Sequence, residues 1–304
     1  MATLVPHLWF DGTAAEAAAF YAQLFPDSEV LSTTVLRNTP EGDALTVRFS
    51  VWGQEFQAID GGDFFHINSS ISFVVNVDPS RVQDARAEVD RLWAGLSEGG
   101  QVLMELGEYP FSERYGWVTD RFGVSWQVML ANPEGDPRPP IVPNLAFGTN
   151  ARTGAEEARD AYLKIFPDAQ AGGLFRFEDM VMPEGAPDVP PQQLAYSDLK
   201  IAGSWVAMMD APGFPEVFSE AVSLILLCED QAEMDRYWDA LTAVPESEQC
   251  GWLKDRFGVS WQITPADMGR MMSEGTPEQI QRVVDTFKPM KKLDAAALRA
   301  AYEG

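Results

Sequence analysis

Histidine and cysteine, two side chains often used in nucleophilic catalysis and in binding transition metals, are rare in this chain. Its 304 residues include only two histidines, His7 and His66, and two cysteines, Cys228 and Cys250. The sequence contains no Gly-x-Ser-x-Gly elbow, phosphate-binding loop, His-Glu-x-x-His helix or Cys-x-x-Cys pair. His66 lies in a surface loop rich in aromatic residues, and a structural role is the alternative for His7, which follows a proline. The sequence therefore favours a site built from neutral polar and aromatic groups.

The most informative aromatic residues lie in a motif that occurs twice. Gly116–Val128 reads GWVTDRFGVSWQV and Gly251–Ile263 reads GWLKDRFGVSWQI, identical at ten of thirteen positions. Asp-Arg-Phe-Gly predicts a turn, because aspartate can bond its own backbone and glycine tolerates positive φ, and the residues after it predict a strand. The tryptophans have two interpretations. They pack in the core of the last hairpin, or they line a pocket for a planar or apolar ligand.

Other segments repeat too, so the chain is a tandem duplication. A strand over 5–10, a helix over 14–24 and strands over 29–36, 44–51 and 55–59 predict one βαβββ unit, and a second unit completes the first half. The pattern restarts in the second half, where Ile201–Asp210 matches Val51–Asp60. Ten residues equivalent to Ser97–Leu106 are missing there, which predicts a shortened sheet, and Met182–Gln193 is interpreted as an insertion.

These repeats divide the chain into four parts. We expect a first domain over 1–131, a linker rich in proline and charge over 132–141, a second domain with a shortened sheet over 142–265, and a tail over 266–304. Threonine, proline and glutamate at 276–278 are typical of a helix start, so the tail is predicted to contain two short helices and to dock on the domains.

Composition excludes several classes of partner. The formal charge of −24 would repel the phosphates of nucleic acids and of anionic lipids. No apolar run approaches the roughly 18 residues that a spanning helix needs, and the N-terminus lacks the pattern of a signal peptide. Two cysteines are too few for a disulfide framework and are interpreted as reduced thiols. We therefore expect a cytoplasmic protein whose partner is a small molecule.

The repeated units carry a family resemblance. Phe20-Tyr, Phe-Pro-Asp, Ile71-Ser-Phe-Val-Val, Asp90-Arg-Leu-Trp and the motif that begins at Tyr115 resemble the PhnB-like branch of the vicinal oxygen chelate superfamily. Members of this branch are labelled 3-demethylubiquinone-9 3-methyltransferase domains, and the superfamily includes glyoxalase I, dioxygenases and bleomycin-resistance proteins. The resemblance covers about residues 4–131 and 142–265. It implies an α+β fold of four βαβββ units in two half-open barrels. The sequence gives the methyltransferase label no support, since it has no glycine-rich loop for a methyl donor.

The resemblance also indicates where a metal would bind, because metal-using members take ligands from the first and last strands of paired units. Those positions correspond to His7, Gln57, Ser72 and Gln127 in the first half, and to Asn144, Ala207, Ser223 and Gln262 in the second. One of the eight is a histidine and none is a carboxylate. Amides and hydroxyls are poor ligands for zinc, iron or nickel. We therefore expect neither a metal nor another cofactor.

The functional hypothesis is metal-free binding, or cofactor-independent turnover, of a small organic molecule in the barrel of the first domain. Its predicted ligand-binding residues are His7, Gln57, Ser72, Trp126 and Gln127, and the second barrel would serve as scaffold. Two alternatives stay open: a divalent-metal lyase, isomerase or dioxygenase of the glyoxalase type, and a structural or partner-binding pseudo-dimer without ligand. The duplication predicts two halves that pack as a pseudo-symmetric pair within a monomer.

Overall fold

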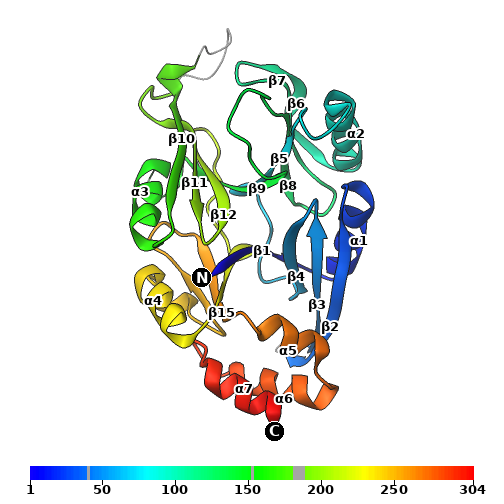
Figure 1. The fold of residues 1–304 in the computed structure, drawn as a ribbon, viewed down its shortest axis with the longest axis vertical. Helices are drawn as coiled ribbons and strands as arrows, with labels where there is room; N and C mark the ends of the chain where they lie inside the picture. Colours follow the sequence, from blue (N-terminus) through cyan, green and yellow to red (C-terminus); the bar gives the residue numbers. More distant parts are fainter. Residues whose placement is uncertain (40–41, 152–153, 181–188) are drawn as a thin grey trace.

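Four repeated units follow one another along the chain, and a helical tail follows them (Figure 1). The computed structural model describes residues 1–39, 42–151, 154–180 and 189–304, so residues 182–188 of the predicted insertion lie outside the described part. The predicted α+β fold of duplicated units is confirmed.

Each unit begins with a strand, continues into a helix and ends in an antiparallel hairpin or meander. Unit 1 consists of β1 (Thr3–Phe10), α1 (Ala14–Leu24), β2 (Glu29–Thr39), β3 (Gly42–Val51) and β4 (Gln54–Asp60). Unit 2 consists of β5 (Ile71–Val77), α2 (Ala85–Ser97), β6 (Gln101–Tyr109), β7 (Ser112–Thr119) and β8 (Ser125–Leu130). Unit 3 consists of β9 (Ile141–Gly148), α3 (Ala155–Ile165), β10 (Gln170–Arg176), β11 (Leu194–Ile201) and β12 (Ser204–Ala211).

Unit 4 is smaller. It consists of β13 (Val222–Cys228), α4 (Gln231–Leu241), β14 (Trp252–Lys254) and β15 (Ser260–Pro265). Within residues 222–265, all of which are described, it has three strands where each other unit has four. The missing strand is the counterpart of β6, at the place where the repeat lacks ten residues.

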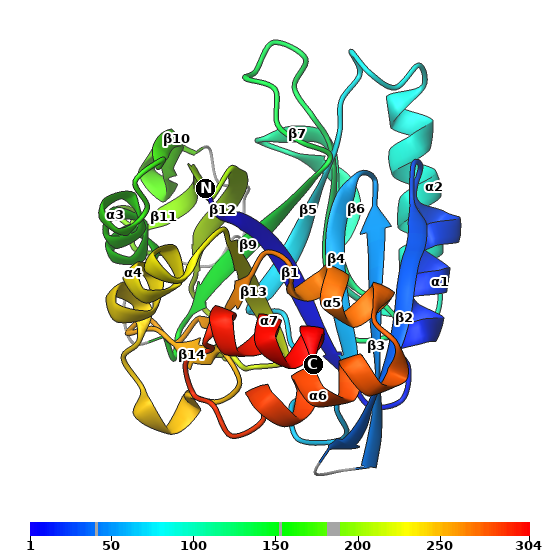
Figure 2. The ribbon, with the colours of Figure 1, turned by 60° about the horizontal axis from the view of Figure 1, so that its bottom comes forward.

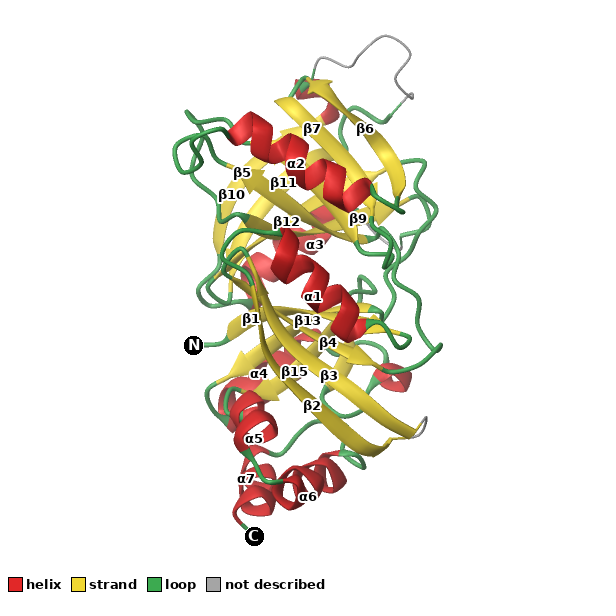
Figure 3. Ribbon diagram, turned by 90° about the vertical axis from the view of Figure 1, so that its right-hand side faces the viewer, coloured by secondary structure: helices red, strands yellow, loops and turns green. Residues whose placement is uncertain are grey.

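The units pair across the two halves of the chain. One sheet has the order β14-β15-β13-β1-β4-β3-β2 and joins units 1 and 4, while the other has the order β10-β11-β12-β9-β5-β8-β7-β6 and joins units 2 and 3. We call these half-open barrels barrel A and barrel B; Figure 3 shows barrel B above barrel A. The junctions are antiparallel, β1 with β13 and β5 with β9. The expectation that each half closes its own barrel is therefore wrong.

This pairing of units from different halves of the chain has a simple structural origin. The first strand of each unit is the free edge of that unit's own sheet, so any other first strand can pair with it. All four first strands are short and apolar, so the hydrophobic pattern does not specify which two of them meet.

The repeated motif holds each half together. The buried Asp120 accepts hydrogen bonds at Oδ1 from the backbone N–H groups of Phe122 and Val124, at 2.8 and 3.0 Å. Its Oδ2 accepts from Tyr21 Oη of α1, at 2.7 Å, and from Trp126 Nε1, at 2.9 Å. Burial, together with the neighbouring carboxylate, raises the pKa of Tyr21, so its hydroxyl stays protonated and donates. The motif thus ties the helix of unit 1 to the last turn of unit 2.

The second half repeats this arrangement. Asp255 accepts from Tyr162 Oη at 2.5 Å and from Trp261 Nε1 at 2.9 Å. Trp126 and Trp261 are both fully buried among aromatic neighbours. Of the two interpretations of these tryptophans, core packing is the one the structure shows.

The tail extends barrel A. Its helices are α5 (Met268–Glu274), α6 (Pro277–Phe287) and α7 (Ala295–Glu303), of which α6 and α7 lie side by side (Figure 2). Thr34 Oγ1 of β2 donates to the backbone carbonyl of Met272, at 3.0 Å. The backbone N–H groups of Cys250 and Gly251 donate to the carbonyls of Met290 and Lys291, both at 2.7 Å. The tail therefore supplies backbone partners close to where unit 4 lacks a strand. No helix of the described residues is long and apolar enough to cross a membrane.

Candidate ligand-binding site

The structure separates the five predicted site residues. His7 and Gln57 lie opposite each other on β1 and β4 of barrel A. Ser72 and Gln127 lie on β5 and β8 of barrel B. Trp126 belongs to neither inner face, because its side chain is buried in the core between sheet and helices, where its indole N–H is bound by Asp120. The predicted group of Gln57, Ser72, Gln127 and Trp126 around one cavity is therefore wrong.

Side-chain alternation defines an inner face in each barrel, turned away from the helices. In β1, Leu4, Leu8 and Phe10 pack in the helix-side core, so His7 and Trp9 point to the inner face. The eight positions indicated by the resemblance then form two groups of four. Barrel A holds His7, Gln57, Ser223 and Gln262, and barrel B holds Ser72, Gln127, Asn144 and Ala207.

In barrel B these polar groups bind one another. Tyr115 Oη donates to Gln127 Oε1 at 2.8 Å, and Gln127 Nε2 donates to Ser72 Oγ at 2.9 Å. Asn144 Nδ2 donates to the same Ser72 oxygen at 3.2 Å. All four residues are buried. This network leaves their amide and hydroxyl groups little capacity to bind a ligand.

An arginine from the predicted linker closes the same barrel. Arg138 Nε donates to the buried Asp198 of β11 at 2.6 Å, and its guanidinium lies 3.7 Å from the centroid of Trp205. The hydrogen bond to Asp198 raises the pKa of Arg138. The sequence predicted a linker between domains over this stretch and did not indicate the pair. Gly172 leaves room for the carboxylate of this pair, because a Cβ atom at that position would lie 1.9 Å from Asp198 Oδ1.

Barrel B is also closed by stacked rings. The indole of Trp117 and the ring of Phe214 lie parallel, with centroids 5.0 Å apart and an interplanar angle of 4°. Val74, Val142 and Ala207 form a separate buried apolar cluster on the inner face. The inner face of barrel B is therefore filled by the protein's own side chains.

Barrel A leaves the equivalent groups less satisfied. Gln262 Nε2 donates to Ser223 Oγ at 3.0 Å, as Gln127 does to Ser72. The tyrosine that holds the amide oxygen in barrel B is replaced by Cys250, whose Sγ donates instead to the tail carbonyl of Lys288. Within the described residues, no donor reaches the amide oxygen of Gln262, and the side chain of half-buried Gln57 has no hydrogen bond.

His7 is the most unusual group on this face. It is 6% exposed, its ring meets Trp252 edge-on at 5.3 Å, and its buried Nδ1 has no hydrogen-bond partner in the described part of the chain. Burial lowers its pKa to about 3, so the imidazole is neutral near pH 7. Thr264 Oγ1 on β15 is a second buried oxygen without a partner among the described residues. Buried polar atoms without partners are uncommon in folded proteins, so these two atoms mark the inner face of barrel A as the candidate site.

Aromatic rings form the wall beside these groups. Trp9 and Trp252 are half-buried, and their ring centroids are 6.3 Å apart. Phe64 follows Asp60 by the same four residues that separate Phe214 from Asp210. Phe214 is stacked on Trp117 in barrel B, whereas Phe64 is 59% exposed. Barrel A therefore lacks the parallel ring pair of barrel B, and Phe65 packs edge-on against Trp9 instead, at a centroid distance of 5.1 Å.

Neither barrel has the donors of a superfamily metal site. Barrel A offers one imidazole, two amides and one hydroxyl, and barrel B offers no imidazole or carboxylate at the four positions. No cluster of three or more histidine, cysteine, aspartate or glutamate side chains suited to a metal occurs among the described residues. Because first-row transition metals need convergent histidine, thiolate or carboxylate ligands, these residues do not fit such a metal.

Comparison with known proteins establishes the family. The sequence model of the 3-demethylubiquinone-9 3-methyltransferase family matches residues 2–129 and again residues 139–264. The chain belongs to this family. It is thus a tandem member of this family, as the resemblance implied.

Two solved structures illustrate what this chain is similar to. The PhnB protein from Bacillus cereus is 34% identical over 42% of this chain and 98% of its own length, with a TM-score of 0.36. Glyoxalase I from Zea mays is 11% identical over 87% of this chain and 93% of its own, with a TM-score of 0.50, which is a likeness of fold alone. Comparison with curated proteins finds no match. The family name does not assign a reaction to this chain, since one fold hosts many activities.

Proposed function

We propose that this chain binds a small organic molecule, without a metal ion, on the inner face of barrel A. The supporting observation is a contrast within one molecule. In barrel B, Gln127 and Ser72 are bonded within a closed network, whereas the equivalent face of barrel A has polar atoms without partners among the described residues, beside half-buried tryptophans.

The chemistry of this face indicates the class of ligand. His7 is neutral and Gln57 and Gln262 are uncharged amides, so the face offers donors and acceptors without a fixed charge. Trp9 and Trp252 add flat apolar surface. A few placed polar groups on an aromatic wall are typical of small-molecule sites. The expected ligand is a planar, uncharged molecule with carbonyl or hydroxyl groups.

Binding is better supported than turnover. A general base works best when its pKa lies near the operating pH. The pKa of His7 is lowered to about 3, so this imidazole is a weak proton acceptor at neutral pH and acts as a hydrogen-bonding group.

A ligand screen with matched variants tests the proposal. Planar oxygen-bearing compounds such as hydroxybenzaldehydes and hydroxyquinolines would be screened by saturation-transfer NMR and thermal shift. Gln262→Leu in barrel A is expected to abolish the hits. Gln127→Leu in barrel B is expected to lower the melting temperature and to keep the hits. The reverse pattern would assign the ligand to barrel B, and a wild-type protein without hits would favour the structural pseudo-dimer.

Elemental analysis separates the proposal from a metal-dependent enzyme of the glyoxalase type. We expect purified protein, after incubation with zinc, nickel, iron or manganese and desalting, to retain only substoichiometric metal. About one ion per chain, lost in His7→Ala, would contradict metal-free binding.

A further inference from the structure

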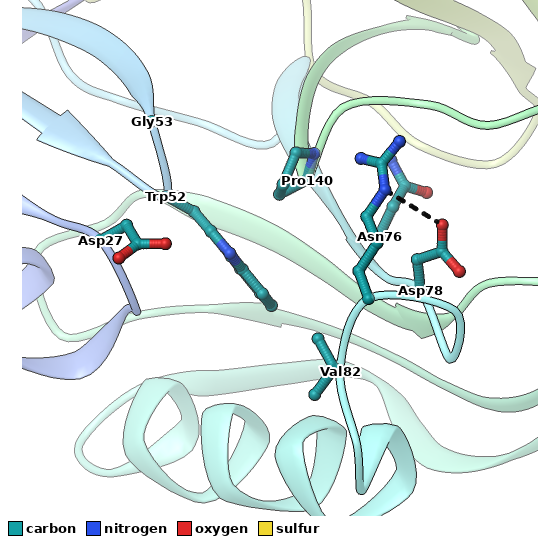
Figure 4. A pocket seen from close by; sticks show the side chains of 8 residues that line it. Asp27, Trp52, Gly53, Asn76, Asp78, Val82 and Pro140 are labelled. Atoms are coloured by element: carbon teal, nitrogen blue, oxygen red, sulfur yellow. Dashed lines mark ion pairs between the residues drawn. The ribbon is translucent and has the colours of Figure 1, made fainter.

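A cavity lies where units 1 and 2 meet the connection between the halves. Its volume is about 340 Å³, and it is lined by residues of turns and strand ends rather than by the barrel A face (Figure 4). Trp52 and Gly53 come from the β3–β4 turn, and Asp27 from the turn after α1. Asn76, Asp78, Arg81 and Val82 lead from β5 into α2, and Pro140 precedes β9.

Trp52, the aromatic residue that lines this cavity, has a backbone conformation that residues other than glycine rarely adopt. Trp52 has a φ of 47°, in the left-handed region that glycine and asparagine occupy most readily. Its counterpart in unit 3 is Ala202, with a φ of 45°. The turn therefore imposes this conformation in both halves, but only unit 1 places a bulky indole there. Figure 4 shows that indole facing Val82, with Pro140 above. Both central residues of such a two-residue hairpin need positive φ, so the turn itself fixes the position of the indole.

A solvent-exposed carboxylate lines the cavity with the indole and binds no other group of the described residues. In unit 3, Asp168 accepts from the turn N–H groups of Ala202 and Gly203, at 3.3 and 3.0 Å. Its counterpart Asp27 is not used in this way. Ser28 Oγ accepts from Trp52 N at 2.8 Å, and the backbone carbonyl of Asp27 accepts from Gly53 N at 3.2 Å. The side-chain carboxylate of Asp27 thus has no partner within the described residues.

The other polar side chains that line the cavity make hydrogen bonds or an ion pair with neighbouring groups. Asp78 accepts from Ser80 N at 2.8 Å and pairs with Arg81 at 3.5 Å. Asn76 Nδ2 donates to the carbonyl of Pro139 at 3.0 Å, and no described donor reaches its amide oxygen. Within the described residues, the groups without a partner are one carboxylate and one amide oxygen beside an indole face, and the charge of the half-exposed Arg81 is offset by Asp78.

We propose that this cavity binds a small organic cation, an amine or quaternary ammonium, stacked on Trp52 and paired with Asp27. An indole face attracts cations through its quadrupole, and a nearby carboxylate adds to that attraction. The formal charge of −24 raises the local concentration of cations around the whole molecule. This site is independent of the one on the barrel A face.

Three probes of similar size distinguish the charge of the ligand. Benzyltrimethylammonium, benzyl alcohol and benzoate would be titrated into ¹⁵N-labelled protein, with the indole N–H signal of Trp52 identified by its loss in Trp52→Ala. The cation is expected to shift that signal and to bind more weakly as NaCl is raised. Asp27→Asn and Trp52→Ala are each expected to weaken binding by at least about fivefold.

Unit 3 provides the matched controls. Asp168→Asn and Ala202→Gly change the equivalent turn and are expected to leave the affinity for benzyltrimethylammonium unchanged. The proposal is overturned if benzoate or benzyl alcohol binds as tightly as the cation, if Asp168→Asn weakens binding as much as Asp27→Asn, or if the cation leaves the Trp52 signal unmoved.

Discussion

The imidazole of His7 lies edge-on to Trp252, and its Nδ1 has no partner in the part of the chain that the structure describes; these surroundings determine how it titrates. Its pKa falls from 6.5 to about 3 on burial. Between those values the unfolded chain binds a proton that the folded chain does not. The contribution of His7 to stability is therefore complete above about pH 6.5 and is lost progressively as the pH falls toward 3.

This titration gives a prediction for His7→Gln, which cannot take up the proton. Wild-type protein should lose roughly 3–5 kcal/mol more unfolding free energy than the variant between pH 7 and pH 3.5. Urea denaturation of both proteins across that range measures the difference, with the other titrating groups common to both. Parallel curves would mean that protonated His7 is accommodated in the folded state.

At the scale of elements, the turn of the repeated motif attaches α1 and α3 each to the unit that follows it in the sequence. The carboxylate of Asp120 or Asp255 joins two backbone N–H groups, a tyrosine hydroxyl and an indole N–H. Removing one donor leaves a buried carboxylate less well solvated, which is more costly than losing a surface contact.

Tyr21→Phe and Tyr162→Phe are therefore expected to destabilise the protein by about 1–3 kcal/mol each. The two sites share no partner, so the double variant should show nearly the sum. Tyr302→Phe is the control, since no bond of that hydroxyl occurs in the described structure, and it should change stability by less than about 0.5 kcal/mol. Chemical denaturation measures all four proteins, and a neutral Tyr21→Phe would show that the hydroxyl bond makes no net contribution.

Local sequence patterns predicted the helices, strands and turns well. They predicted the contacts between these elements much less well. The Asp-Arg-Phe-Gly turns, the capping box at Thr276 and the missing ten residues are all encoded within short stretches. The face on which Trp126 lies depends on which side the helix packs, which a strand with buried residues on both faces does not reveal. Arg138 was missed because its partner Asp198 is 60 residues away.

At the scale of the whole molecule, the pairing of units makes the two halves interdependent. Each half exposes the edges of two first strands, and the other half covers them. This arrangement is the covalent equivalent of a symmetric dimer in which each barrel takes one unit from each subunit.

The chain itself is expected to sediment as a monomer of 33.6 kDa. Residues 1–138 expressed alone should instead form a homodimer, because β1 of one copy can pair with β5 of another as it pairs with β13 here. Sedimentation velocity of both proteins is the measurement. A folded, monomeric half would contradict this account, and a stable dimer of the full chain would show that it has a further interface.

The exchange of units also sets an order of events during synthesis on the ribosome. Barrel B is built from one continuous stretch, units 2 and 3, and can close once residue 211 has emerged. Barrel A must wait, since Thr3 pairs with Leu227, which is translated 224 residues later. Domains tend to fold as their residues emerge. The closed barrel would thus be finished first, and unit 1 would wait beside it with an open edge until unit 4 and the tail complete the face that carries His7.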